Sequence, residues 1–588
     1  MSLSLSKVSN SYFSKLFLSN DESAVSRDSR AKVLLLDKFT TSIISMCYTQ
    51  SQLLEHDIIL VELIENQNKL NMMKHLSCIV YIKPTKESIQ SLIRELNKPH
   101  FSNYKLFLNN IISKTQLESL ANADEFEVIS KVIEIFQDYL IVNDNLFMIN
   151  LENATQNQTI EESNSISSLL LSLRKCPLIK YESTSFELKK LSSEILYNIN
   201  SNTNNNLFDE LNQALDVPPL LLLLDRKNDP ITPLISPWTY QSMIHELIGI
   251  NRNIVVLSDK EQLTLSEDQD KFFQESMYLN YGDLTEKFQA YVEEYKKQTK
   301  QSSIDNLKTQ NLSELKNMLT KFPEYRKLSN NILKHLNLIS EIDKQISDQN
   351  LWEVGELQQT IICNLESQLF LKSKLLQVLD NIQISTVNKL KLILLYSVRF
   401  NNMEDLNHFS SKLNDPLITS PLPTVSQNGL IKKFRKLFSS NITSNTSNNN
   451  NNNIGNIFNN QRIKINQLFN HNSSQSTKTD NIYMQYTPKL HEILNNVLNT
   501  DAQRNDQTLS NLSTVIPDNV SNQYGGRVDG YSAQDIIIYI KGGVTYEEAR
   551  LVHELNESNN SINLVIGGDC ILNSSQWLSK LYDLVNES

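Results

Sequence analysis

The stretch with the most suggestive chemistry follows five consecutive leucines. Residues 220–224 are all leucine, and the charged run DRKNDP (225–230) comes directly after them. The end of a buried strand is where α/β enzymes often place acid–base groups. However, no Ser, His or Cys stands beside Asp225 or Asp229 to complete a catalytic triad. We therefore predict that these carboxylates support the fold, and that Arg226 makes buried charge-assisted bonds between elements.

The elements around this stretch follow from local signals. Asn228-Asp229-Pro230 is a turn signal, because Asn and Asp bond their own backbone and Pro restricts the preceding residue. Ser236 and Pro237 are expected to be the N-cap and first residue of a helix, with Gly249 at its end. One face of this helix is apolar at helical spacing. Its residues are Tyr240, Met243, Ile244, Leu247 and Ile248.

The N-terminal part alternates apolar runs with helical patterns. The apolar runs are KVLLLDKFTTSII (32–44), DIILVELI (57–64), CIVYIKP (78–84) and KLFLNNI (105–111). Continuous apolar runs are typical of strands buried on both faces, and their alternation with helices predicts βαβ units and a parallel sheet. The segment KVIEIFQDYL (131–140) is expected to close this domain near residue 150.

The C-terminal part shows the same alternation of apolar runs and helical patterns. DIIIYIKGGVTYEEARLVHEL (535–555) and INLVIGGDCILNSSQWLSKL (562–581) each predict a strand, a glycine pair and a helix. Neither pair completes GxGxxG or GxxxxGK[ST], so we expect a strand-to-helix turn with positive φ at each pair. A domain made of 153–265 and 500–588, split by an insertion at 266–499, follows from this arrangement.

The middle of the chain is predicted to be mostly helical. Between Pro323 and Ile342, apolar residues recur at spacings of three and four, which gives one helical face broken at its start by Pro323. This face fits either a core helix or a helical hairpin that presents itself to another helix. Residues 438–476 are rich in Asn and Ser, and we expect a disordered insertion there. Residues 1–30 predict a short amphipathic helix around SYFSKLFL followed by a tether; their acidic residues argue against a transit peptide.

Composition limits the classes of function. The chain has 588 residues, 40% of them hydrophobic, which suits three or four domains. Its net charge of −11 disfavours nucleic-acid binding, and its five scattered cysteines fit a reducing cytosolic compartment. Since no apolar run approaches the roughly 18–20 residues that span a bilayer, we expect membrane contact to be indirect.

Several longer segments together resemble one known family. LLLLDRKNDPITPLISPWTYQSMIHELIGI, KVLLLDKFTTSIISMCYTQSQLLEHDIILVELIE, LWEVGELQQTIIC, LKLILLYSVRF and GGVTYEEARLVHELNES are similar to the SM (Sec/Munc-type) family of SNARE-binding proteins, in its vacuolar protein-sorting branch. The likeness covers most of 31–410 and about 480–585, in the same order. It implies no catalytic residue and no cofactor. The signature residues that it marks as structural are Asp225, Arg226, Asp229, Pro230, Trp238, His245 and Glu246.

The resemblance implies a partner and two binding sites. The partner is a Qa-SNARE of the syntaxin type, alone or in a SNARE complex that includes a vesicle SNARE. The SNARE's N-terminal peptide would dock on the first domain. The matching residues there are Phe107, Ile111, Leu117 and Leu120. In a hairpin of the helical domain, Lys321 and Pro323 match the region that meets the vesicle SNARE.

The sequence thus predicts an α/β protein shaped as a three-domain arch, with two parallel-sheet domains and a mainly helical inserted domain. The expected bounds are 1–30 for an extension, 31–152 for domain 1, 153–265 and 500–588 for domain 2, and 266–499 for domain 3. The expected function is a monomeric, non-enzymatic SNARE regulator on Golgi and endosomal membranes. Two other classes stay open: a nucleotide-binding enzyme, and a scaffold for a non-SNARE tether or coat protein.

Overall fold

The computed structural model comprises two compact units, which are described separately. The first contains Met1–Arg226, Glu492–Val544 and Leu551–Ile571, and the second contains Lys227–His491, Thr545–Arg550 and Leu572–Ser588. The residues that the structure describes are 3–17, 31–69, 71–149, 151, 158–201, 207–208, 211, 215–301, 312–363, 366–400, 402–413, 429–431, 434–435, 481–498, 511–525 and 533–586. Among them, no helix is both long and apolar enough to cross a bilayer.

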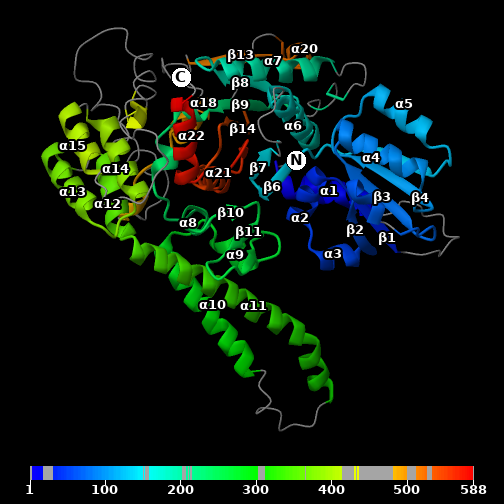
Figure 1. Ribbon diagram of the computed structural model, residues 1–588, viewed down its shortest axis with the longest axis horizontal. Coiled ribbons are helices and arrows are strands. Elements are labelled where there is room, and N and C mark those ends of the chain that lie inside the picture. The colour runs from blue at the N-terminus through cyan, green and yellow to red at the C-terminus, as the bar shows by residue number, and fades with distance from the viewer. Residues whose placement is uncertain are drawn as a thin grey trace. The chain divides into compact units, whose positions relative to one another are not determined.

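The first unit begins with a five-stranded parallel sheet in the order β2-β1-β3-β4-β5 (Figure 1). The strands are β1 (Lys32–Leu36), β2 (Ile58–Leu63), β3 (Ser77–Ile82), β4 (Asn103–Leu108) and β5 (Ile129–Glu134). The helices are α2 (Lys38–Cys47), α3 (Gln50–Glu55), α4 (Lys86–Asn97) and α5 (Lys114–Ala123). Side chains of β1 alternate between the core under α4 and α5 and the core under α2 and α3. This burial on both faces confirms the predicted βαβ arrangement.

The second sheet of this unit has seven strands in the order β13-β8-β9-β14-β15-β7-β6. They are β6 (Tyr139–Asn143), β7 (Leu146–Ile149), β8 (Leu178–Glu182), β9 (Leu220–Asp225), β13 (Leu512–Val515), β14 (Asp535–Lys541) and β15 (Asn563–Gly568). The helices of this part are α6 (Gln158–Leu173), α7 (Phe186–Ser201), α20 (Asp518–Tyr524) and, from Leu551 on, α21 (Tyr546–Ser558). The five inner strands are parallel, while β13 and β6 pair antiparallel at the edges.

Strand β9 lies inside this sheet, between β8 and β14, and all six of its residues are buried. The leucine run is thus a central strand, as its lack of alternation predicts. The chain leaves the first sheet at Glu134 and enters the second at Tyr139. The expected domain bounds remain a prediction, with this change of sheet falling before residue 150.

The two glycine pairs differ. Gly542 and Gly543 have φ of +93° and +117°, which confirms the predicted turn after β14. The same prediction for Gly567 and Gly568 is wrong, because both lie within β15. Gly567 is required for another reason: a Cβ there would lie 2.4 Å from the ring of Phe147 on the neighbouring strand. Close packing between strands, not a turn, explains this pair.

The second unit is mainly helical, and the stretch after residue 266 that was predicted to be helical lies within it up to His491. Its elements include η4 (Thr232–Leu234), α8 (Tyr240–Leu247), α9 (Lys271–Ser276), α10 (Tyr281–Gln301), α11 (Leu312–Asp348), α12 (Leu351–Ile362), α13 (Gln368–Asp380), α14 (Thr386–Arg399), α15 (Met403–Leu413), η6 (Ile482–Met484) and α22 (Ser574–Asn586). A small antiparallel sheet joins β10 (Ile250–Asn251), β11 (Ile254–Val256) and β12 (Gln262–Thr264). Three elements have residues in both units: helix α18 (Lys489–Leu498), helix α21 and the 3-10 helix η3 (Arg226–Asn228).

Helix α11 corrects one expectation. It runs without a break through Pro323, where the sequence predicted an interruption. A proline ring removes one intrahelical hydrogen bond, and the bonds of the flanking turns continue the helix. Of the predicted apolar face, Ile339 and Ile342 are buried, while Leu336 is exposed.

Helix α8 starts later than predicted. Its N-cap is Thr239 and its first residue Tyr240, so the assignment of Ser236 and Pro237 to a helix start is wrong. The polar groups of Ser236 are used in tertiary contacts instead: its backbone N–H donates to Gln358 Oε1, and its hydroxyl accepts from Lys391 Nζ. Gly249 ends the helix with φ of +101°, as predicted.

The N-terminal helix is present as α1 (Leu5–Phe17). The predicted tether that follows it and the predicted insertion at 438–476 lie outside the described residues.

Candidate partner-binding site

The carboxyl ends of the first sheet meet at the point where an open α/β sheet usually binds its ligand. Asp37 directly follows β1, which pairs in parallel with β3. Asp37 accepts hydrogen bonds from the backbone N–H of Phe39 and Thr40 at the start of α2. It also accepts from Lys83 N–H and Ser88 Oγ. These are donors that a bound phosphate would need, so the chain's own carboxylate occupies that position.

The second sheet shows the same arrangement. The N–H of Gly542 in the glycine turn donates to Asp569 Oδ1 at 2.9 Å. Beside it, Arg226 Nε donates to Gly543 O at 2.9 Å, while the Arg226 side chain is 1% exposed. Lys541 pairs with Glu162 at 2.8 Å. The chain's own groups therefore make contacts at the turn after β14, the end of the sheet where nucleotide-binding folds hold phosphate.

The two acids of the DRKNDP run, Asp225 and Asp229, have structural contacts. Asp225 accepts from Ser185 Oγ at 2.7 Å, and its backbone N–H donates to Glu182. Asp229 accepts from the backbone N–H and hydroxyl of Thr232, which fixes the turn into η4. Each carboxylate is committed to the fold around β9.

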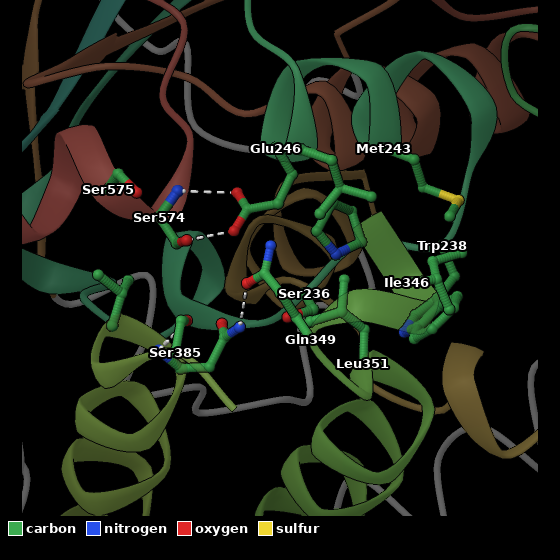
Figure 2. Close-up of a pocket in the computed structure, with 14 residues that line it drawn as sticks. Ser236, Trp238, Met243, Glu246, Ile346, Gln349, Leu351, Ser385, Ser574 and Ser575 are labelled. Carbon is green, nitrogen blue, oxygen red and sulfur yellow. Dashed lines mark hydrogen bonds between the residues drawn. The ribbon is translucent and has the colours of Figure 1, made fainter. Parts of the chain in front are cut away.

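Two signature residues of the second unit, Trp238 and Glu246, line a cavity of about 290 Å³ (Figure 2). Glu246 forms one wall. Lys391 Nζ lies 3.1 Å from Glu246 Oε1, and Ser574 donates to Glu246 from its backbone N–H and its hydroxyl. Burial alone would raise the pKa of Glu246, but Lys391 and Ser574 hold it below its ordinary value. The network joins α8, α14 and α22.

Trp238 also lines this cavity (Figure 2). Its indole stacks on Trp352 with a centroid separation of 4.4 Å. A Cβ on Gly355 would lie 2.7 Å from the indole, so only glycine allows α12 to approach this closely. The remaining signature residues also serve packing: His245 Nδ1 accepts from the N–H of Ile250, and Pro230 O accepts from Trp577 Nε1.

The predicted peptide-binding residues have very different exposures. Phe107 and Leu120 are each 1% exposed and belong to the cores on opposite faces of the first sheet, so they offer no surface to a peptide. Ile111 is half-buried and packs against the core of the second sheet. Leu117 is 43% exposed on α5. The structure therefore leaves Leu117 as the accessible member of the set.

Sequence reasoning missed two exposed apolar neighbours of Leu117 along the chain. Phe126 follows α5 and is 59% exposed, and Val132 on the edge strand β5 is 41% exposed. The capping box of Ser113 and Gln116 fixes the start of α5, and Gln116 also donates to Pro84 O after β3. These contacts hold the helix that presents Leu117 on the body of the sheet.

The predicted hairpin residues Lys321 and Pro323 both lie in α11, which runs beside α10 (Figure 1). The helix is anchored at its root by His335. Tyr240 Oη lies 2.8 Å from His335 Nδ1, and His335 Nε2 lies 2.8 Å from Asp270 Oδ2. Lys334 also pairs with Asp270.

Comparison with known proteins identifies the family. The family model described as Sec1 family matches residues 32–580.

The chain belongs to the Sec1 family.

This Sec1-family chain is 38% identical to vacuolar protein sorting-associated protein 45 of Saccharomyces cerevisiae, over 98% of the chain and 99% of that protein. It is 32% identical to the Rattus norvegicus protein of the same name, over 94% of the chain and 92% of that protein. A solved structure described as SM protein Vps45 in complex with Qa SNARE Tlg2 matches with a TM-score of 0.80 and 31% identity. It covers 100% of this chain and 98% of the other. These findings confirm the resemblance and the α/β fold class.

Proposed function

We propose that this chain is a SNARE regulator that binds a Qa-SNARE of the syntaxin type and promotes SNARE assembly in vesicle docking and fusion. Its transport step would lie between Golgi, endosome and vacuole, with the chain reaching those membranes through its SNARE partner as a monomer. The observation that supports this most is the full-length likeness to a structure described as a complex with a Qa SNARE.

The chemistry of the two sheets supports a binding role. Both positions where an α/β sheet would hold a phosphate are filled by carboxylates of the chain, Asp37 and Asp569. Binding of a SNARE peptide needs accessible apolar side chains, and Leu117 on α5 is one of them.

The direct test is calorimetric titration of the purified full chain with the cytoplasmic segment of a Qa-SNARE from the trans-Golgi and endosomal set. We expect saturable binding with one SNARE per chain. Syntaxin-type segments from the plasma membrane serve as a specificity control. Absence of binding to any Qa-SNARE, with capture of a tether or coat protein instead, would overturn the proposal.

We further propose that Leu117 contacts the N-terminal peptide of that SNARE. Burying an apolar anchor of this size contributes about 1.5–3 kcal/mol, and placing a guanidinium in its site costs at least as much. Leu117→Arg should thus weaken peptide binding by about a hundredfold. Because Leu117 is 43% exposed, the melting temperature of the Leu117→Arg variant should differ from that of wild type by only a few degrees.

A matched control is available on another helix that packs on the same sheet. Leu54 on α3 is 60% exposed, so Leu54→Arg makes the same chemical change at another site. We expect this variant to bind the peptide normally. Equal binding by the Leu117→Arg variant and wild type would place the peptide elsewhere, while loss of fold with binding would show that Leu117 is needed for packing.

A further inference from the structure

The N-terminal helix α1 contributes to two different hydrophobic cores. At its start, Leu3 and Leu5 are buried in the core of the seven-stranded sheet. At its end, Phe13, Leu16 and Phe17 are buried in the core on one face of the five-stranded sheet. A single helix therefore supplies apolar side chains to both sheets of the first unit.

Polar contacts fix both ends of this helix. Ser4 Oγ donates to Asp144 Oδ1 at 2.7 Å, and the N–H of Ser6 donates to the same carboxylate. Asp144 lies in the turn between β6 and β7, so these bonds tie the start of α1 to the second sheet. At the other end, Lys32 Nζ at the start of β1 donates to Phe17 O at 2.8 Å.

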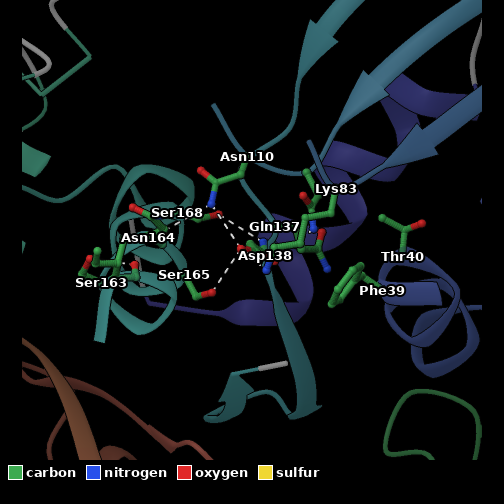
Figure 3. Close-up of polar contacts among 12 residues, drawn as sticks. Phe39, Thr40, Lys83, Asn110, Gln137, Asp138, Ser163, Asn164, Ser165 and Ser168 are labelled. Atoms are coloured by element: carbon green, nitrogen blue, oxygen red, sulfur yellow. Dashed lines mark hydrogen bonds and ion pairs between the residues drawn. The ribbon is translucent and has the colours of Figure 1, made fainter. Parts of the chain in front are cut away.

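The middle of α1 contacts the connection between the sheets. Gln137, which is fully buried between β5 and β6, donates from Nε2 to Ser9 Oγ at 3.1 Å. Polar groups surround the carboxylate of the adjoining Asp138 (Figure 3). It accepts hydrogen bonds from Asn109, Asn110 and Ser165 and forms an ion pair with Lys83. Hydrogen bonds and one ion pair thus hold the connection, and α1 adds the apolar contacts beside it.

We propose that α1 is a clasp that couples the two sheets of the first unit, so that they open and unfold as one body. The family model begins at residue 32, so it does not include this helix. The proposal does not depend on SNARE binding. It rests on the position of α1 in both cores and on its bonds to the turn at Asp144, to Gln137 and to Lys32.

The test is hydrogen exchange of the full chain with one end of the clasp weakened. Leu5→Asp places a charge in the core of the second sheet. If α1 is a clasp, its release should raise exchange at least tenfold in residues 135–138 and in the Phe13–Phe17 end of the helix. Phe13→Asp weakens the other end of the helix, so it should raise exchange in residues 135–138 and in the Leu5 end of α1.

Matched controls come from the exposed face of the same helix. Lys7→Asp should leave exchange unchanged, because Lys7 is exposed. Should either Asp variant fail to fold, Leu5→Ala and Phe13→Ala are measured in its place, with the same pattern expected at smaller amplitude. Exchange that rises only among direct neighbours of the substituted residue, with the far end of α1 and residues 135–138 still protected, would overturn the proposal.

Discussion

Replacing Lys391 by Met should destabilise the second unit severely. The Lys391 side chain is 1% exposed. Its Nζ lies 3.1 Å from each of three oxygens: Ser236 Oγ, Glu246 Oε1 and Ser574 Oγ. Methionine keeps much of the length and apolar volume of this side chain but removes the charge. The substitution therefore leaves the carboxylate of Glu246, whose side chain is only 12% exposed, without its counter-ion.

The magnitude follows from that unpaired charge. Removing one partner of a buried ion pair costs about 3–5 kcal/mol. Because Glu246 keeps its two hydrogen bonds from Ser574, we expect the lower end, about 3 kcal/mol. For a unit of this size, each kcal/mol shifts the midpoint by about 2–4 °C, so the melting temperature should fall by about 6–12 °C.

Tryptophan fluorescence is the suitable assay. All three tryptophans of the chain, Trp238, Trp352 and Trp577, lie in the second unit, so the signal reports this unit selectively. Glu246→Gln and the double variant complete a cycle, in which the coupling energy should exceed about 1 kcal/mol.

Lys374→Met on the exposed face of α13 is the control and should be neutral. A Lys391→Met midpoint within about 2 °C of wild type, or strict additivity of the two substitutions, would refute the reasoning.

Three further outcomes are expected. Burial holds the pKa of His335 below its ordinary value, so the unfolded chain takes up a proton first as pH falls below about 6.5. The free energy of unfolding of the second unit should therefore decrease as the pH is lowered from 7 to 5. The His335→Gln variant should be less stable at pH 7, but its free energy of unfolding, measured by urea titration, should change less with pH, by up to about 1.4 kcal/mol per pH unit. Gly567→Ala forces a Cβ against Phe147 and should cost at least about 1–3 kcal/mol by circular dichroism, whereas Gly282→Ala should be mild; equal midpoints would contradict the packing argument. Pro323→Ala restores a backbone donor inside α11, so it should slow hydrogen exchange there and raise affinity for the vesicle SNARE; unchanged affinity would leave Pro323 a structural role alone.

The sequence predicted best where one physical signal decides the outcome. The leucine run of β9 has no polar alternation, and a strand of this kind can only lie inside a sheet covered on both faces. The turn at Gly542 and the end of α8 at Gly249 follow equally from backbone conformations that glycine adopts without strain.

Predictions failed where a distant contact outweighs a local one. Ser236 and Pro237 carry the local signal of a helix start, yet Gln358 and Lys391 use the polar groups of Ser236. The exposure of Leu117 beside the burial of Leu120 depends on which side of α5 faces the sheet. Periodicity shows that a helix has an apolar side but gives no information on which other apolar residues remain outside.

The pairing of strands was the feature that could be predicted least from the sequence. The sequence contains no local sign that residues 139–149 leave the first sheet and join β15, because that pairing connects residues more than 400 positions apart. Long-range pairing of this kind follows from the whole core, not from any window of sequence.

The order of strands in the second sheet has a consequence for synthesis. Strand β9 pairs with β14, which lies more than 300 residues later, and β14 and β15 separate β9 from β7. During synthesis on the ribosome, β9 and β7 therefore each keep one edge unpaired until β14 and β15, near the end of the given sequence, have emerged. At about 5–20 residues per second, that delay is on the order of half a minute. The nascent chain should accordingly depend on a chaperone that shields strand edges over this interval, while the five-stranded sheet, complete by Glu134, can form early.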